Sequence, residues 1–268
     1  MTGRLLRLEL RRSRALVGWL SLTALLYGAT MAAFFPSMRE SAAMMEQVLK
    51  IWPKEMLVAF GMDKDLGLTD PGSFFAIYAG EFFPVLAAIA AIFLATRTTT
   101  VDVDRGWGEI SLATPLSRTR QMAVAIAVQA VGMGILAIGT VGGLVLVDPL
   151  VGARFDAGRF GLAAIDTWIY GCAVAAVATL IGSLTLSRGL TGGIVAGVLI
   201  AMYLVSVVVA LEPSLDWLRN ASAFSWFDTA TVIDEGRIEA GGPVVFGAVA
   251  LLGWAASFAV WRRRDLVG

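Results

Sequence analysis

Long apolar runs divided by polar segments are the dominant pattern of this chain. Apolar runs of about 18 or more residues predict helices that cross a membrane rather than the buried core of a soluble domain. Six such spans are predicted, over Ala15–Phe35, Phe74–Thr96, Gln121–Val147, Gly161–Leu186, Leu190–Leu211 and Pro243–Trp261. The sequence therefore predicts an all-α polytopic membrane protein, with residues 1–268 in a single transmembrane domain.

The distribution of charge predicts the orientation of these spans. With both termini in the cytoplasm, the inner segments hold 13 of the 21 Lys and Arg residues but only 5 of the 21 Asp and Glu residues. Because cytoplasmic segments carry the excess of Lys and Arg, the prediction is a six-span protein with both the N- and C-termini inside.

The N-terminal residues 3–14 have the pattern of a short amphipathic helix. On a helical wheel, leucines share a broad face and four arginines cluster opposite: Arg4, Arg7, Arg11 and Arg14. Such a helix is expected to lie in the inner membrane interface, held by apolar burial and by anionic headgroups. The alternative is a plain basic anchor for the first span.

Composition narrows the chemistry further. The chain is 57% hydrophobic and 16% charged, with a mean hydropathy of +0.76, a formal net charge of zero and no histidine. Zero net charge gives no indication of nucleic-acid binding, and the single cysteine, Cys172, excludes a disulfide framework within one chain. No phosphate-binding P-loop and no Ser/His/Asp arrangement occurs. We therefore expect no enzyme activity, cofactor or metal in this chain.

Two acidic residues fall within predicted spans. A second span that began after Glu81 would be too short to cross, so Glu81 is expected at or below the outer edge of the hydrocarbon. It is either a residue that lines a translocation path or an interfacial acid held by water and a neighbouring helix. Pro84, one turn later, is expected to kink the helix near the same place. Asp166 is a similar candidate nearer the interface, with Arg159 as its partner.

A further pattern concerns the packing of the helices. Small residues recur at a spacing of four, which lets helices approach closely; the pairs are Gly139/Gly143, Gly171/Ala175, Ala178/Gly182 and Gly193/Gly197. We expect contacts within the chain, with a dimer contact as the alternative.

The last outer loop, Glu212–Gly242, is rich in aromatic residues, which are expected to lie flat at the outer interface or, alternatively, to dip into it as short re-entrant pieces.

The loop 97–120, between the second and third spans, carries the most specific motif. Its run Arg105–Arg118 reads R-G-W-G-E-I-S-L-A-T-P-L-S-R. This run resembles the signature of type-2 ABC transporter permeases, in which an acidic, Gly-containing loop leads into a phrase like T-L-E-L-L-L-A-T-P-V-S-R. The matching residues are Gly106, Glu109, Leu112, Ala113, Thr114, Pro115, Ser117 and Arg118. Trp107 and Gly108 stand where Thr and Leu are usual.

The resemblance covers nearly the whole chain. The close Trp261–Leu266, the basic N-terminal helix, the long first outer loop, and Glu81 with Pro84 are similar to the subgroup found beside antibiotic- and multidrug-export ATPases. It implies an exporter in a bacterial inner membrane, made of two permease copies and two separate ATPase subunits that bind ATP and magnesium. The coupling residues it implies are Asp102, Asp104, Arg105, Gly106, Glu109, Ile110, Leu112, Thr114, Pro115, Ser117 and Arg118.

The residues themselves agree with a docking element. Ile110 and Leu112 supply apolar area for a partner, while the charges of the loop set orientation. Ser117 is expected to cap the third span, and Thr114-Pro115 to stop the coupling helix. The alternative is a plain cytoplasmic connector.

Three functions stay open at this point. The first is export of an amphipathic or hydrophobic compound, such as a drug, antibiotic or lipid. The second is a membrane scaffold that transmits force without transport. A self-sufficient secondary transporter is disfavoured by the lack of repeats and of ionisable residues near the midplane.

Overall fold

A computed structural model describes residues 2–49, 51–53, 56–57, 82–100, 117–227 and 229–263. Every regular element in these ranges is helical, and no strand occurs in them. Six of the helices are long and apolar enough to cross a membrane. The predicted all-α fold with six spanning helices is therefore confirmed.

Five of the six spanning helices are longer than their predicted apolar runs, and α4 is described only from Phe82 onward. They are α1 (Thr2–Leu49), α4 (Phe82–Thr99), α7 (Arg118–Val151), α8 (Ala157–Thr185), α9 (Arg188–Leu211) and α11 (Gly241–Arg263). Short elements between α9 and α11 are the 3-10 helices η1 (Pro213–Ala221) and η2 (Ala223–Ser225) and the helix α10 (Thr229–Glu235). The run Phe74–Glu81, which we assigned to the second span, lies outside the described residues.

The first helix differs from the prediction. We expected an interfacial helix over residues 3–14 and a span ending at Phe35, but α1 is one continuous helix from Thr2 to Leu49, with Pro36 inside it. The apolar run ends at Phe35 because a helix that leaves the hydrocarbon no longer needs apolar side chains, and its backbone hydrogen bonds continue regardless. The interfacial position of residues 3–14 stays a prediction.

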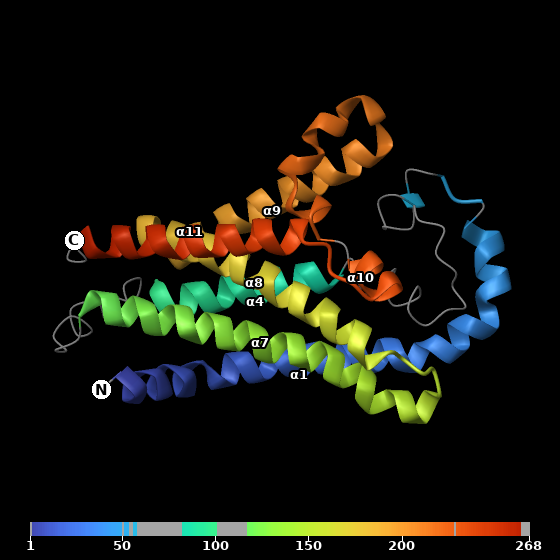
Figure 1. The fold of residues 1–268 in the computed structure, drawn as a ribbon, viewed down its shortest axis with the longest axis horizontal. Coiled ribbons are helices and arrows are strands. Elements are labelled where there is room, and N and C mark those ends of the chain that lie inside the picture. The colour runs from blue at the N-terminus through green and yellow to red at the C-terminus, as the bar shows by residue number, and fades with distance from the viewer. Residues whose placement is uncertain are drawn as a thin grey trace.

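Helix α8 is the centre of the bundle. It packs against α4, α7, α9, α10 and α11, and it is the most buried of the spanning helices. Helix α1 packs chiefly on α7, and α9 is the least buried span. The start of α1, the start of α7 and the end of α11 lie at one end of the bundle (Figure 1). We call this the basic end, because the arginines of these termini gather there, among them Arg11, Arg120 and Arg263.

Glycines bring α1 and α7 into backbone contact. A Cβ on Gly143 would overlap the carbonyl oxygen of Leu25 and lie 2.8 Å from the amide nitrogen of Ala29. A Cβ on Gly28 of α1 would likewise overlap the carbonyl oxygen of Thr140. The Gly139/Gly143 pair thus packs within the chain, as predicted.

The other small-residue pairs differ in whether they pack within the chain. A Cβ on Gly182 of α8 would lie 2.9 Å from Cγ2 of Thr100, so that pair also packs within the chain. Gly193 and Gly197 of α9 are exposed, and among the described residues no atom lies within 4 Å of an added Cβ on either. Within the described part of the chain this pair therefore lacks the predicted contact, because α9 packs on the bundle through its opposite face, at Thr191 and Val195.

Substitution of Gly143 tests the α1–α7 contact. We expect Gly143→Ala to lower the free energy of unfolding by about 1–3 kcal/mol, because the added methyl group meets backbone atoms that cannot move aside. The matched control is Gly142→Ala, whose Cβ meets nothing within 4 Å. Unfolding in mixed detergent micelles measures both, and equal stability of the two variants would contradict the close approach.

Candidate functional site

The predicted coupling loop is described only at its flanks. Residues 101–116 lie outside the described residues, and with them Asp102, Asp104, Arg105, Gly106, Glu109, Ile110, Leu112, Thr114 and Pro115. The described flanks are the last turn of α4, which ends at Thr99, and the start of α7 at Ser117. The start of α7 lies at the basic end, and the last turn of α4 points toward it, so the loop connects two helices on this side of the bundle.

The translocation-path candidates are also only partly described. Glu81 lies outside the described residues, as does Gly80, whose carbonyl the predicted Pro84 kink would free. Pro84 itself is buried in the first described turn of α4. Asp166 is buried in α8 with 2% of its surface exposed. Arg159 contacts Asp156 and the carbonyl of Ile233, and its pairing with Asp166 stays a prediction.

Ser117 begins α7, but not through its side chain. It has the extended backbone of an N-cap residue, and its carbonyl accepts hydrogen bonds from the amides of Arg120 (2.9 Å) and Gln121 (3.1 Å). Its hydroxyl makes no cap hydrogen bond and lies 3.2 Å from the hydroxyl of Thr119. The predicted position of the helix start is confirmed, and the predicted side-chain cap is wrong.

The last turn of α4 is packed tightly on α8. Thr99 and Thr100 are buried, and their hydroxyls donate to the carbonyls of Ala95 (2.6 Å) and Thr96 (3.0 Å) on their own helix. Back-bonding of this kind satisfies a hydroxyl without water. Thr99 and Thr100 face Gly182, which leaves room for them.

A buried amide joins the same turn to three other helices. Gln129 of α7 has no exposed surface. Its Nε2 donates to the hydroxyl of Thr98 on α4 (2.9 Å), and its Oε1 accepts from the hydroxyl of Thr179 on α8 (3.0 Å) and from the indole Nε1 of Trp254 on α11 (3.2 Å). We call these four residues the Gln129 network. The network was not predicted from the sequence, although Gln129 is the one amide within the third predicted span after Gln121.

Arginines tie the helices together at the basic end. Arg97 of α4 donates from Nη2 to the backbone carbonyl of Arg12 on α1 (3.5 Å). Arg12 pairs with Glu9 on its own helix at 3.3 Å, and the guanidinium of Arg188 lies 5.7 Å from the centre of the Phe93 ring. A cation above an aromatic face is attracted by the ring, which ties the start of α9 to α4.

An apolar cavity opens between α8, α9 and α11. Its volume is about 140 Å³, and its lining is apolar, including Val174, Val195, Met202 and Phe246. Tyr170, also in the lining, is fully buried, and its hydroxyl makes no hydrogen bond with the described residues. A dry apolar cavity of about 150 Å³ accepts a ligand as large as benzene. The cavity therefore suits an apolar group, not an ion or a sugar.

The last outer loop folds back along α9. The Ser222 hydroxyl donates to the Met202 carbonyl (2.8 Å), nine residues before the end of α9, and Phe224 packs edge-on against the ring of Tyr203. Ser222 also caps η2. A contact beside α9 is what the re-entrant alternative expects, and both interpretations, aromatics flat at the interface or re-entrant, stay predictions.

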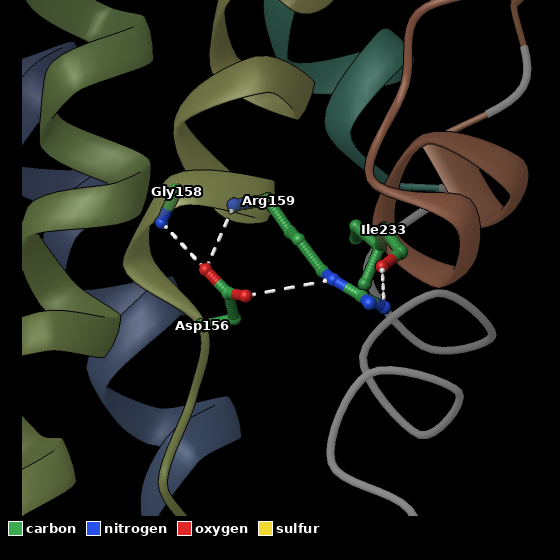
Figure 2. A network of polar contacts seen from close by, with 4 residues as sticks. All are labelled: Asp156, Gly158, Arg159 and Ile233. Carbon is green, nitrogen blue, oxygen red and sulfur yellow. Dashed lines mark hydrogen bonds and ion pairs between the residues drawn. The ribbon is translucent and has the colours of Figure 1, made fainter.

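A clamp holds α10 on the start of α8 (Figure 2); we call it the outer clamp, because the predicted orientation puts this end of the bundle outside. The Asp156 carboxylate caps α8 by accepting from the amides of Gly158 (2.9 Å) and Arg159 (3.2 Å). Arg159 lies 3.5 Å from the same carboxylate and donates to the carbonyl of Ile233 near the end of α10 (3.1 Å). Next to it, the Glu235 carboxylate accepts a hydrogen bond from Arg237 and raises the pKa of that guanidinium.

Within the described ranges no group of three or more Cys, Asp or Glu side chains is arranged to hold a metal ion.

No protein-family model matches the chain, and no curated protein is significantly similar to it.

Substitution of Asp156 tests the outer clamp. We expect Asp156→Ala to lower the free energy of unfolding by about 1 kcal/mol, because two amides lose their cap. Asp156→Asn keeps the capping oxygen and should remain near the parent. The control, Asp216→Ala, removes an exposed 3.7 Å pair with Arg219 and should change stability by less than about 0.5 kcal/mol. Thermal unfolding in detergent measures all three, and an Asn variant as unstable as the Ala variant would refute the capping role.

Proposed function

We propose that this chain is the membrane-spanning permease subunit of an ATP-driven exporter of the ABC type. The observation that carries the proposal is the run Arg105–Arg118, whose A-T-P-L-S-R phrase leads directly into a spanning helix. The proposed assembly has two permease copies and two ATPase subunits in a bacterial inner membrane. ATP and magnesium are bound by the ATPase subunits, and the permease itself hydrolyses nothing.

The anchoring of the loop supports a coupling role. Its two ends are the start of a 34-residue helix and a helix turn that is bonded to α1 and α7 and packed on α8. An element held in this way moves the helices when a partner moves it. Closure of the ATPase pair would displace the loop and rock the two permease copies against each other about their interface.

The spans support a hydrophobic or amphipathic substrate. The described cavity between α8, α9 and α11 has an apolar lining, and the described spans contain no cluster of charged side chains that suits an ion or a sugar. Drugs, antibiotics and lipid-like molecules are the compounds of this character. The path would run along the permease interface, with Glu81 and Pro84 beside it.

The rival function is a scaffold that transmits force to an outer partner and transports nothing. Such a partner could bind α10, which the outer clamp holds on α8, together with η1 and η2, which pack on α9. ATPase activity of the purified complex that rises with apolar compounds favours export. A stable complex with an outer protein and no such rise favours the scaffold.

Co-purification tests the proposed coupling loop. We expect the parent to retain an ABC-type ATPase, and Glu109→Arg with Leu112→Asp to reduce that retention about tenfold or more, since each lost 1.4 kcal/mol of contact is about a factor of ten. The control makes the same changes at the outer end, Glu239→Arg with Leu150→Asp, where Leu150 is 85% exposed. A parent without ATPase, or equal retention in both variants, would overturn the coupling role.

A further inference from the structure

The donor atoms in the Gln129 network determine how the side-chain amide of Gln129 is oriented. The indole nitrogen of Trp254 only donates, so it must face the Oε1 of Gln129. The Nε2 of Gln129 then points to Thr98, whose own hydroxyl proton goes to the carbonyl of Leu94 (2.8 Å). The single proton of the Thr179 hydroxyl lies between the Oε1 of Gln129 (3.0 Å) and the carbonyl of Ala175 on its own helix (2.7 Å). The amide thus has one orientation, which hydrogen-bonds α4 and α11 and places its Oε1 beside the Thr179 hydroxyl of α8.

The network lies directly behind one end of the predicted coupling loop. Thr98 is in the last turn of α4, two residues before the last described residue, Thr100. Gln129 lies eleven residues into α7, which is about 16 Å along its axis. The first three turns of α7 therefore extend past the end of α4, and the α4 side of the loop is attached at the depth of Gln129.

Separation of this amide from its partners is costly. Gln129 has no exposed surface, and an unpaired amide among apolar side chains is strongly disfavoured. A displacement of the α4 end must therefore carry the Gln129 partners with it or break a hydrogen bond that nothing replaces. The helices α8 and α11 receive the movement through Thr179 and Trp254.

From this geometry we infer that Gln129 is a positioning residue that transmits movement of the coupling loop from α4 into α8 and α11. The inference rests on the proposed function, because it needs an ATPase that moves the loop. Two other features of the structure support no comparable inference. The exposed face of α9 has nothing on it that indicates its partner, and the outer clamp lies at the far end from the loop.

The variants separate the network from general packing. Gln129→Leu removes all three bonds with little change of volume, and Thr98→Val removes only the α4 arm. The matched control is Thr96→Val on the same helix, since the Thr96 hydroxyl bonds only the carbonyls of Ile92 and Phe93 on its own helix. All variants carry Cys172→Ala, which removes the single native cysteine.

Helix movement is measured with two spin labels, one on a helix outside the Gln129 network and one on a helix that belongs to it. Cysteines replace Leu26 of α1, which is 54% exposed and outside the network, and Leu251 of α11, which is 70% exposed. The labelled chain, diluted with unlabelled chain and bound to the ATPase in lipid, is measured by pulsed electron paramagnetic resonance. The label distance is compared without nucleotide and after trapping with ADP and vanadate.

We expect trapping to change the label distance in the parent and in Thr96→Val. In Gln129→Leu and Thr98→Val the change should fall below half of the parent value, while the bound ATPase and its trapped nucleotide stay at the parent level. A merely structural residue would not produce this combination.

Three results would overturn the inference. They are an unchanged shift in Gln129→Leu and Thr98→Val, an equal loss in Thr96→Val, or a parent that binds the ATPase with no shift at all. A parent that binds no ATPase would instead refute the proposed function.

Discussion

A polar side chain among apolar helices must find its partners inside the protein, because neither lipid nor packed side chains replace water. Gln129 meets this constraint with hydrogen bonds to three helices. Only one rotation and one depth of α4, α7, α8 and α11 bring Thr98, Thr179 and Trp254 within reach of one amide. The register of four of the six spans is therefore tied to a single side chain.

Apolar packing alone would not fix this register. Lipid tails are as apolar as leucine, so helices in a membrane are held by close contact and by hydrogen bonds. The chain uses the two means in different places. Backbone contact at Gly28 and Gly143 holds α1 on α7, and the Gln129 network holds α7 to the rest. Helix α9 has little of either, which leaves Gly193 and Gly197 open.

The sequence predicted what hydropathy encodes and missed what depends on distant partners. The six spans follow from apolar runs alone. The continuity of α1 through Pro36 was missed, because the end of an apolar run marks where lipid stops and not where the helix stops. Gln129 was visible as an isolated amide, but its partners are 31, 50 and 125 residues away, and no local pattern reports them.

The two flanks of the predicted coupling loop differ in how they meet the bundle. Within one turn, α4 is joined to α1 through Arg97 and to α7 through Thr98, and it is packed on α8 at Thr100. At the other flank, Ser117 begins a helix that extends about 16 Å before it reaches the Gln129 network. A displacement at the α4 flank therefore reaches three helices within one turn, whereas one at Ser117 first meets α11 at Met122 and Trp261 and reaches the Gln129 network three turns along α7. This asymmetry makes α4 the shorter mechanical route from the basic end to the centre of the bundle.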